Sequence, residues 1–465
     1  MTDDELTRRL SETLREEAVK ITSSPDAYER FAQRTANVPP LRPNPNRRLW
    51  LALPVGAIAL AAAVVLVVVL APGRSRSTST EVASGKTAAA SALNGAGIPG
   101  GVSNVGPAAR AASAAGAGSA GSAGSATVTP SGAAVPVGFA PVSVTFTSPD
   151  DGWVLGTAPC ASAPCTSIVR TTDGGHTWVG IPAPRATLTD DAQETATSIS
   201  ELRFADPLDG WAFGPGMWAT HDGGATWHAV TFPGMSSDAE VSDVEASDGF
   251  VQAAVLDDAS VRILTSPVSS DSWRGAAVSL QIGAGPVPQV QIVLQGSVGW
   301  LIEVDRVVVD GARLVSGQWQ AWTPPCASAV GPAVMSAFST SGLVAACDVG
   351  LWSTPAGEHL YDSSDGGASF VETGAAAPAR PGTTAGVATP TADSVVLAAG
   401  SDLLRSINAG HSWTTVFSGT GSAWSDLGFT TAAQGVAIEG APGTGTPTRL
   451  LMTFDGGASW AAVSF

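Results

Sequence analysis

Lysine is nearly absent from this chain, since only Lys20 and Lys86 occur in 465 residues. Charged residues of all kinds make up 14% of the sequence, against about 25% in an average soluble protein. The formal net charge is −17, whereas a surface that binds phosphates needs clustered lysine and arginine. The composition therefore argues against DNA or RNA as a partner, and the low charge predicts an unusual, non-globular segment.

Catalytic sequence motifs are missing as well. The chain has no Gly-x-Ser-x-Gly, no His-Glu-x-x-His and no phosphate-binding loop, and its histidines and cysteines show no spacing typical of metal ligands. We therefore expect no catalytic residue, no metal and no cofactor. A solvated acidic surface explains the many carboxylates most simply, and a calcium site built from turn carboxylates stays open as an alternative.

One long hydrophobic run divides the chain. Residues 49–71 are 23 consecutive uncharged positions, which as a helix would be about 34 Å long, enough for a bilayer core of about 30 Å. A signal peptide would have a shorter apolar region nearer the start of the chain. The run predicts a single transmembrane helix.

The four cysteines indicate which side of the membrane holds the larger part. Basic residues flank the run almost equally, but Cys160, Cys165, Cys326 and Cys347 all follow it. An even number of cysteines in two local pairs predicts the disulfides Cys160–Cys165 and Cys326–Cys347 in an oxidising compartment. We expect a cell-membrane protein with a cytoplasmic N-terminus and an extracytoplasmic C-terminal part.

The two segments that flank the run lack a globular pattern. In residues 1–48, apolar residues recur at every fourth position from Leu6 to Ala18, which predicts a short amphipathic helix. This head resembles the cytosolic tails of actinobacterial single-pass membrane proteins. Residues 72–138 are rich in alanine, glycine and serine and contain no aromatic residue and almost no charge, so we expect a flexible linker that forms no core.

A repeat organises residues 139–465. A phrase of the type Thr-x-Asp-Gly-Gly-x-Thr-Trp recurs five times, and two eroded copies lie between the second and third. The aromatic residues that end the seven copies are 43 to 51 positions apart: Trp178, Trp227, Trp273, Trp319, Phe370, Trp413 and Trp460. Each period contains four short apolar runs bounded by turn residues, such as Val142–Phe146 at its start. Four strands in a period of 40–50 residues predict a β-propeller blade, and hence an all-β, seven-bladed propeller.

These phrases resemble the Asp box of sialidase-type propellers, also called the bacterial neuraminidase repeat. With their upstream Phe and Gly-Trp elements, the repeats are most similar to those of the photosystem II stability/assembly factor family. An aspartate in such a turn accepts backbone hydrogen bonds, and glycine permits a positive φ. We therefore assign a structural role to the box residues: Asp173, Gly175, Trp178, Asp222, Gly224, Trp227, Asp365, Gly367, Phe370, Asn408, Gly410, Trp413, Asp455, Gly457 and Trp460.

The resemblance to sialidases does not extend to their catalytic residues. Those enzymes use a tyrosine nucleophile and an arginine triad on inner strands, whereas the repeats of this chain contain a single tyrosine, Tyr361, where a third strand is expected. After residue 138 there are 31 acidic residues, 10 arginines and no lysine, a balance of −21. The sequence thus favours a membrane-anchored, non-enzymatic module that binds a cell-surface protein or glycan, with a sialidase-like glycoside hydrolase as the alternative.

Overall fold

A computed structural model describes the C-terminal part of the chain, namely residues 132–161, 165–188, 197–282, 289–305, 307–326, 333–348, 357–373, 376–378, 384–420, 424–440 and 447–465. The predicted head, the run 49–71 and nearly all of the linker lie outside these residues. Within the described ranges the regular elements are strands, and no helix there is long and apolar enough to cross a membrane.

Seven four-stranded antiparallel sheets form the described part, and each follows the sequence order of its strands. Blade 1 contains β1 (Ala140–Phe146), β2 (Gly152–Thr157), β3 (Thr166–Thr171) and β4 (Val179–Ile181), and blade 2 contains β5 (Glu201–Phe204), β6 (Gly210–Phe213), β7 (Met217–Thr220) and β8 (His228–Ala229). Blade 3 contains β9 (Glu240–Ser247), β10 (Phe250–Asp257), β11 (Ser260–Pro267) and β12 (Arg274–Gln281), and blade 4 contains β13 (Gln289–Gln295), β14 (Val298–Asp305), β15 (Val307–Val315) and β16 (Gln318–Ala321). Blade 5 contains β17 (Ala333–Ala337), β18 (Leu343–Asp348), β19 (Glu358–Ser363) and β20 (Val371–Glu372), and blade 6 contains β21 (Thr384–Thr391), β22 (Ser394–Ala399), β23 (Asp402–Ser406) and β24 (Thr414–Ser418). Blade 7 contains β25 (Trp424–Phe429), β26 (Gly435–Glu439), β27 (Arg449–Thr453) and β28 (Ala461–Ala462).

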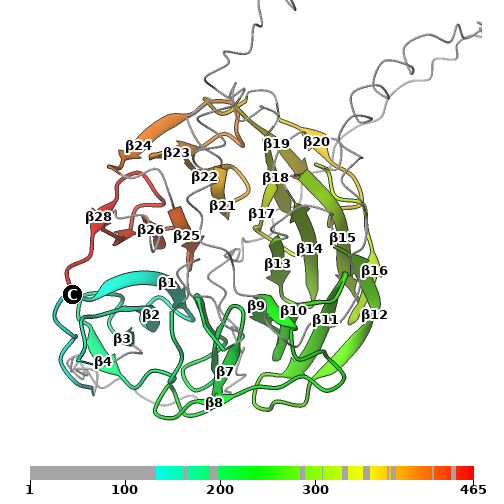
Figure 1. The fold of residues 1–465 in the computed structure, drawn as a ribbon. Coiled ribbons are helices and arrows are strands. Elements are labelled where there is room, and N and C mark those ends of the chain that lie inside the picture. Colours follow the sequence, from blue (N-terminus) through cyan, green and yellow to red (C-terminus); the bar gives the residue numbers. More distant parts are fainter. Residues whose placement is uncertain are drawn as a thin grey trace, which may run out of the picture. The chain divides into compact units, whose positions relative to one another are not determined.

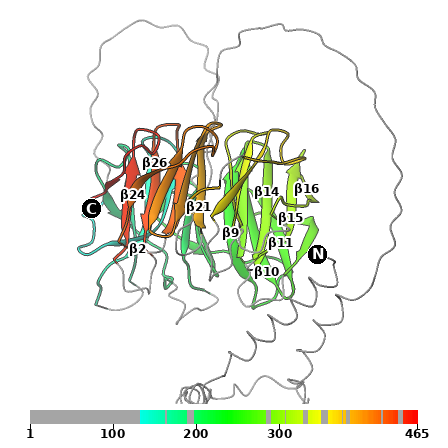
Figure 2. The ribbon, with the colours of Figure 1, turned by 90° about the horizontal axis from the view of Figure 1, so that it is seen from above.

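The blades follow one another around a ring, as the colour sequence in Figure 1 shows, and the predicted seven-bladed propeller is confirmed. The first strand of each blade lies innermost, and consecutive strands run antiparallel between the two faces of the ring (Figure 2). The turns between first and second and between third and fourth strands therefore share one face, which we name the Asp-box face. The loops between second and third strands and the connections between blades share the other, which we name the disulfide face.

The core consists of seven apolar clusters, and each lies between two neighbouring blades. The aromatic residue that ends each repeat packs against its own blade and against a neighbouring one. Trp178, for example, belongs to a cluster that joins blade 1 to Val436 and Met452 of blade 7. Because every junction receives one such residue, the repeat spacing of the aromatics also fixes the spacing of the blades.

Side chains close the ring between blades 7 and 1. Blade 7 supplies all four of its own strands, so residues 134–139 add no strand to it. Residues 132–138 lie instead beside the outermost strand of blade 1, where Ala133 forms an isolated bridge with Gly180. The ring centroid of Phe465 lies 4.9 Å from that of Phe139 and 5.5 Å from that of Trp178.

Local hydrogen bonds hold the turns that contain the predicted box residues. In blade 7, Asp455 accepts hydrogen bonds from the backbone N–H of Ser459 at 2.9 Å and from the Thr453 hydroxyl at 2.8 Å. The Ser459 hydroxyl also donates to Asp455, and these bonds lower the pKa of its carboxyl to about 2. Gly457 has a φ of +82°, which favours glycine. Asn408 accepts the equivalent backbone bond from Ser412 in blade 6.

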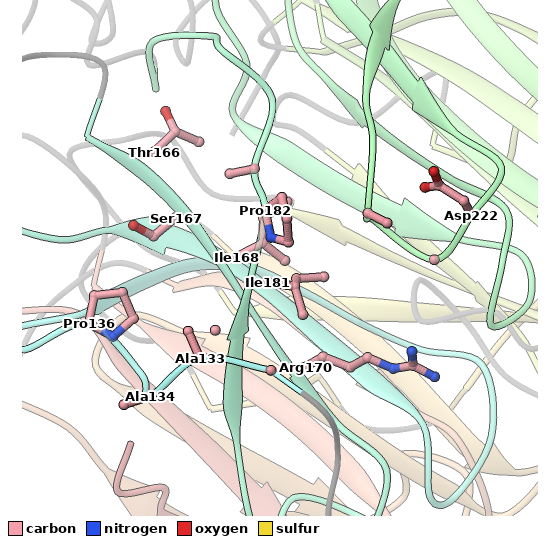
Figure 3. A pocket seen from close by; sticks show the side chains of 15 residues that line it. Ala133, Ala134, Pro136, Thr166, Ser167, Ile168, Arg170, Ile181, Pro182 and Asp222 are labelled. Carbon is pink, nitrogen blue, oxygen red and sulfur yellow. The ribbon is translucent and has the colours of Figure 1, made fainter.

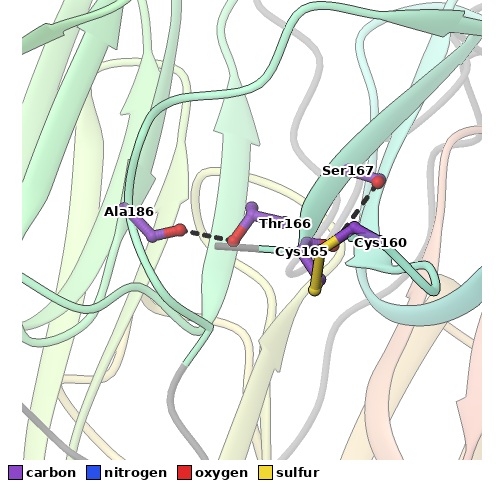
Figure 4. Close-up of a disulfide and its surroundings, with 5 residues drawn as sticks. All are labelled: Cys160, Cys165, Thr166, Ser167 and Ala186. Atoms are coloured by element: carbon purple, nitrogen blue, oxygen red, sulfur yellow. Dashed lines mark hydrogen bonds between the residues drawn. A yellow bond between two sulfur atoms is a disulfide. The ribbon is translucent and has the colours of Figure 1, made fainter. Parts of the chain in front are cut away.

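Both predicted disulfides are present, and both lie on the disulfide face. Cys160–Cys165 closes the loop between β2 and β3, where the Thr166 hydroxyl donates to the carbonyl of Ala186 (Figure 4). Cys326–Cys347 joins the segment after β16 to β18 and so links blade 4 to blade 5. Cys326 and Cys347 are 2% and 0% exposed.

We expect the two disulfides to contribute unequally to stability. In the loop-entropy estimate, Cys326–Cys347, with a sequence separation of 21, is worth about 3 kcal/mol and Cys160–Cys165, with a separation of 5, about 2 kcal/mol. Removing Cys326–Cys347 also leaves a small cavity at a blade junction, which adds to the loss. Denaturant unfolding of the two double cysteine-to-alanine variants under non-reducing conditions measures the difference. An equal or larger loss in the Cys160→Ala, Cys165→Ala variant would contradict the expected order.

Candidate functional site

A group of charged side chains lies at the centre of the ring, on the innermost strands. Glu201 and Arg203 come from β5, Asp243 and Glu245 from β9, and Asp426 from β25. Together with Val290, Gln291, Gly386, Ser425 and Leu427 they line a cavity of about 140 Å³. Glu201, Val290 and Gly386 lie at or near the beginning of their strands, so this side of the cavity is nearer the disulfide face, whereas Arg203 and Glu245 lie further along theirs.

Arg203 is the single cation of this central acidic cavity among the residues that line it. Its side chain is 5% exposed, and its Nε lies 3.1 Å from an Oε of Glu245. A terminal nitrogen lies 3.7 Å from an Oε of Glu201. The guanidinium also donates to the backbone carbonyls of Val244 at 3.3 Å and Leu202 at 3.2 Å. One arginine thus faces four carboxyl groups while holding β5 to β9.

Two of the four carboxyl groups accept backbone hydrogen bonds across blade junctions. Asp243 accepts the N–H of Ile292 on β13 at 2.6 Å, and Asp426 accepts the N–H of Val144 on β1 at 2.7 Å. The polar side chain of Gln291 links blade 4 to blade 5 in a similar way. Asp243 and Asp426 are therefore committed to holding neighbouring innermost strands together.

The cavity raises the pKa of every carboxyl group in it. Burial, with the charge of Asp243 adding to it, raises the pKa of Glu201 to about 8. Burial raises the pKa of Glu245 to about 7 although Arg203 opposes the shift, and burial together with Glu245 raises that of Asp243 to about 7. Burial likewise raises the pKa of Asp426. The group therefore binds protons near neutral pH, where carboxyl groups in water are ionised.

Glu201 is the carboxyl group that a ligand would meet. Its side chain is 39% exposed, although the ring surrounds it, because it faces the cavity; that of Glu245 is 6% exposed. A carboxylate that is accessible from solvent yet poorly hydrated attracts a cation more strongly than one on an open surface.

A larger hollow of about 580 Å³ lies at the outer edge of blade 1 (Figure 3). It is lined by residues 132–134, Pro136, Ile168 and Ile181, and by the turn that begins with Asp222 in blade 2. Its charged side chains already have partners, since Arg170 pairs with Asp151 at 3.3 Å and Asp222 belongs to a box turn. Among the described residues, the charged side chains of this hollow are therefore already engaged in structural contacts.

None of the residues selected from sequence lines the central cavity. The box residues are on turns at the Asp-box face, and Tyr361 is on β19, the predicted third strand of blade 5. The sequence analysis missed Glu201, Arg203 and Glu245. A charged residue on the first strand of a repeat could have indicated this site. That strand is the innermost one of its blade, so such a side chain faces either a neighbouring blade or the centre of the ring.

Two histidines and an aspartate that the sequence does not bring together also converge. His221, His228 and Asp271 have ligand atoms within 4.8 Å of one another on the described part of the chain. No bound metal was expected from sequence, and this cluster is the arrangement of described residues that qualifies as a candidate metal centre.

No protein-family model matches the chain, and no curated protein does. Among solved structures, YCF48 bound to a D1 peptide aligns with a TM-score of 0.48 and 19% identity, covering 69% of this chain and 95% of that chain. YCF48 from Cyanidioschyzon merolae aligns with a TM-score of 0.47 and 17% identity, covering 69% of this chain and 97% of that chain. The GH74 enzyme of Niastella koreensis aligns with a TM-score of 0.35 and 14% identity, covering 70% of this chain and 65% of that chain. At these values the similarities carry no argument about function.

Proposed function

We propose that this chain is a membrane-tethered, extracytoplasmic propeller that binds a surface protein without catalysing a reaction. The central acidic cavity carries the proposal. It presents Glu201 near the disulfide face of a ring whose residues after 138 have a charge balance of −21. A partner with a lysine or arginine side chain in an exposed loop is complementary to such a surface.

The size of the cavity favours a single side chain over a whole small molecule. About 140 Å³ is well below the about 300–1,000 Å³ of typical small-molecule sites. An ammonium or guanidinium group is small enough to enter, and Glu201 is placed to pair with it. The charge and size together favour a protein over a neutral surface glycan.

The predicted anchor and linker support a location at the cell surface. The uncharged run 49–71 and the four cysteines that follow it support a single span with the propeller outside. The repeats resemble those of photosystem II assembly factors, which supports a binding module. We do not extend the identity of their partners to this chain, because its repeats are strongly acidic and contain no lysine.

Glycoside hydrolysis is the second candidate, and one observation favours it. The pKa of Glu201, about 8, suits a general acid. Such enzymes also need a second carboxylate as base or nucleophile. Here Asp243 and Asp426 accept backbone hydrogen bonds and Glu245 pairs with Arg203, so binding is the better supported function.

The full-length chain in phospholipid nanodiscs provides the test, with arginine- and lysine-containing peptides as probes. We expect Glu201→Gln to weaken peptide binding about 10-fold, which corresponds to about 1.4 kcal/mol. Affinity should rise from pH 6 to pH 9 in the wild type, because the Glu201 carboxyl loses its proton over that range. Asp238→Asn, which alters an exposed carboxyl on the same face, is the matched control.

Two results would overturn the binding assignment. One is equal peptide affinity of the wild type and Glu201→Gln at pH 9. The other is hydrolysis of a glycoside panel by the wild type that Glu201→Gln abolishes, which would establish the second candidate instead.

A further inference from the structure

Three side chains with metal-binding atoms meet between blades 2 and 3, on the Asp-box face. His221 lies in the turn after β7, His228 begins β8, and Asp271 lies in the turn before β12. The Nε2 atom of His228 is 2.6 Å from an Oδ of Asp271, and the Nε2 atom of His221 is 3.4 Å from the same oxygen. The side chains of His221, His228 and Asp271 are 29%, 53% and 26% exposed, so solvent reaches the site.

A fourth residue fixes the orientation of the first histidine. The Nδ1 atom of His221 lies 2.5 Å from an Oδ of Asp209, at the end of the turn before β6. This contact places a proton on Nδ1, which leaves Nε2 as the atom that faces Asp271. In a neutral imidazole this Nε2 carries a lone pair directed at a carboxylate oxygen, and the repulsion is relieved by a second proton or by a cation between the two atoms. A carboxylate behind a metal-binding histidine is the usual supporting partner in zinc sites.

Asp271 is available for this role because its own repeat has lost the box. Val268 stands where four of the other repeats have the turn aspartate, and the carboxylate of Asp271 forms hydrogen bonds with His221 and His228 of blade 2. In the repeat of blade 2 the residue equivalent to Asp271 is Ala225. The loss of a box in blade 3 thus coincides with the one group of three metal-binding side chains found among the described residues.

From this arrangement we propose that His221, His228 and Asp271 form a binding site for a divalent transition metal of the zinc class, with Asp209 as the supporting carboxylate. Two ligands at about 2.0–2.2 Å from a tetrahedral zinc lie about 3.3–3.5 Å apart, which matches the separation of His221 and Asp271. The half-exposed ring of His228 needs to move outward by less than 1 Å, roughly, to reach the same spacing. Imidazole and carboxylate ligands suit zinc, nickel, copper and cobalt, and a position on the metal stays open to water or to a donor group of a partner.

Titration of the untagged full-length chain with ZnCl₂, after removal of metals, tests the proposal, and CoCl₂ provides a visible absorption spectrum that reports the ligand geometry. We expect one zinc per chain and a tetrahedral or five-coordinate cobalt spectrum. Asp209→Asn should weaken binding about 10–100-fold, as loss of a supporting carboxylate does. His228→Ala and Asp271→Asn should weaken it further, because each removes a ligand.

His176→Ala is the matched control, since His176 is also exposed on a box turn but stacks on Phe454 away from any second histidine. It should bind zinc as the wild type does. Circular dichroism of each variant shows whether it is folded. His228→Ala removes the most exposed ligand, so it is the ligand variant whose fold should be least affected. The proposal is wrong if the folded wild type binds no zinc, or if His228→Ala and His176→Ala bind it equally.

Discussion

Replacing Arg203 by methionine is expected to destabilise the propeller by about 3–5 kcal/mol at pH 8 and by much less at pH 5. Arg203 is 5% exposed and pairs with Glu245, while Asp243, Glu201 and Asp426 surround it. Removing it at pH 8 leaves several ionised carboxylates around the cavity without a cation. At pH 5 Glu201, Asp243 and Glu245, whose pKa values are about 7 to 8, are protonated. The loss then comes mainly from packing and from the two hydrogen bonds that Arg203 donates to backbone carbonyls.

The sign of this pH dependence follows from the raised pKa values. A carboxyl group whose pKa is about 7 or 8 in the folded chain, and close to 4 in the unfolded chain, binds more protons when folded. Its contribution to stability is therefore complete below about pH 4 and is lost as the pH rises through 7 to 8. Arg203→Met raises these pKa values further and makes the loss steeper.

Guanidinium unfolding at pH 5 and pH 8, followed by tryptophan fluorescence, measures the effect. Arg274→Met is the control, because Arg274 is an exposed residue at the beginning of β12, and its loss should change stability by no more than about 0.5 kcal/mol. A loss in Arg203→Met that is the same at both pH values would mean that the surrounding carboxyl groups do not determine the role of this arginine.

The fold was predictable because its signals are local and repeated. Four of the box turns combine an aspartate, two glycines and a hydroxyl within a few residues, and the fifth has Asn408-Ala409-Gly410 instead. Each indicates a hairpin without knowledge of the rest of the chain. Five such turns and seven spaced aromatics then fix the number of blades. Ring closure was not predictable in the same way, because it depends on contacts of Phe465 with Phe139 and Trp178, which are far apart in the sequence and have no pattern of their own.

The candidate sites were not predictable from the sequence, because their residues lie far apart in it and follow no repeated pattern. Glu201, Asp243 and Asp426 come from three blades and meet only when the ring is complete. His228 and Asp271 are 43 residues apart and contact each other through the eroded repeat of blade 3. A propeller assembles its sites from single residues of several repeats, so the spacing rules that identify metal or catalytic motifs along one element do not apply to it.

Trp153 provides the second large expected effect. It is completely buried on β2, and its ring stacks on Phe204 of blade 2 with centroids 4.1 Å apart and an interplanar angle of 6°. The guanidinium of Arg170 lies 5.0 Å from the ring centroid. Trp153→Ala removes a large side chain from the junction of blades 1 and 2, and the cavity should cost about 3–5 kcal/mol. Denaturant unfolding of the full-length chain measures this loss.

A second variant separates the contribution of the ring stack from that of the indole N–H, and a third serves as a surface control. Within the described residues, the Nε1 atom of Trp153 is buried without a hydrogen-bond partner, so Trp153→Phe keeps an aromatic ring on Phe204 and removes an unsatisfied donor. We expect it to lose far less stability than Trp153→Ala. Phe454→Ala is the surface control, because Phe454 is 55% exposed and stacks on His176 at the Asp-box face, and it should change stability by no more than about 0.5 kcal/mol. If Trp153→Ala lost no more than Phe454→Ala, the apolar contacts between blades 1 and 2 could not be a main source of the stability of the ring.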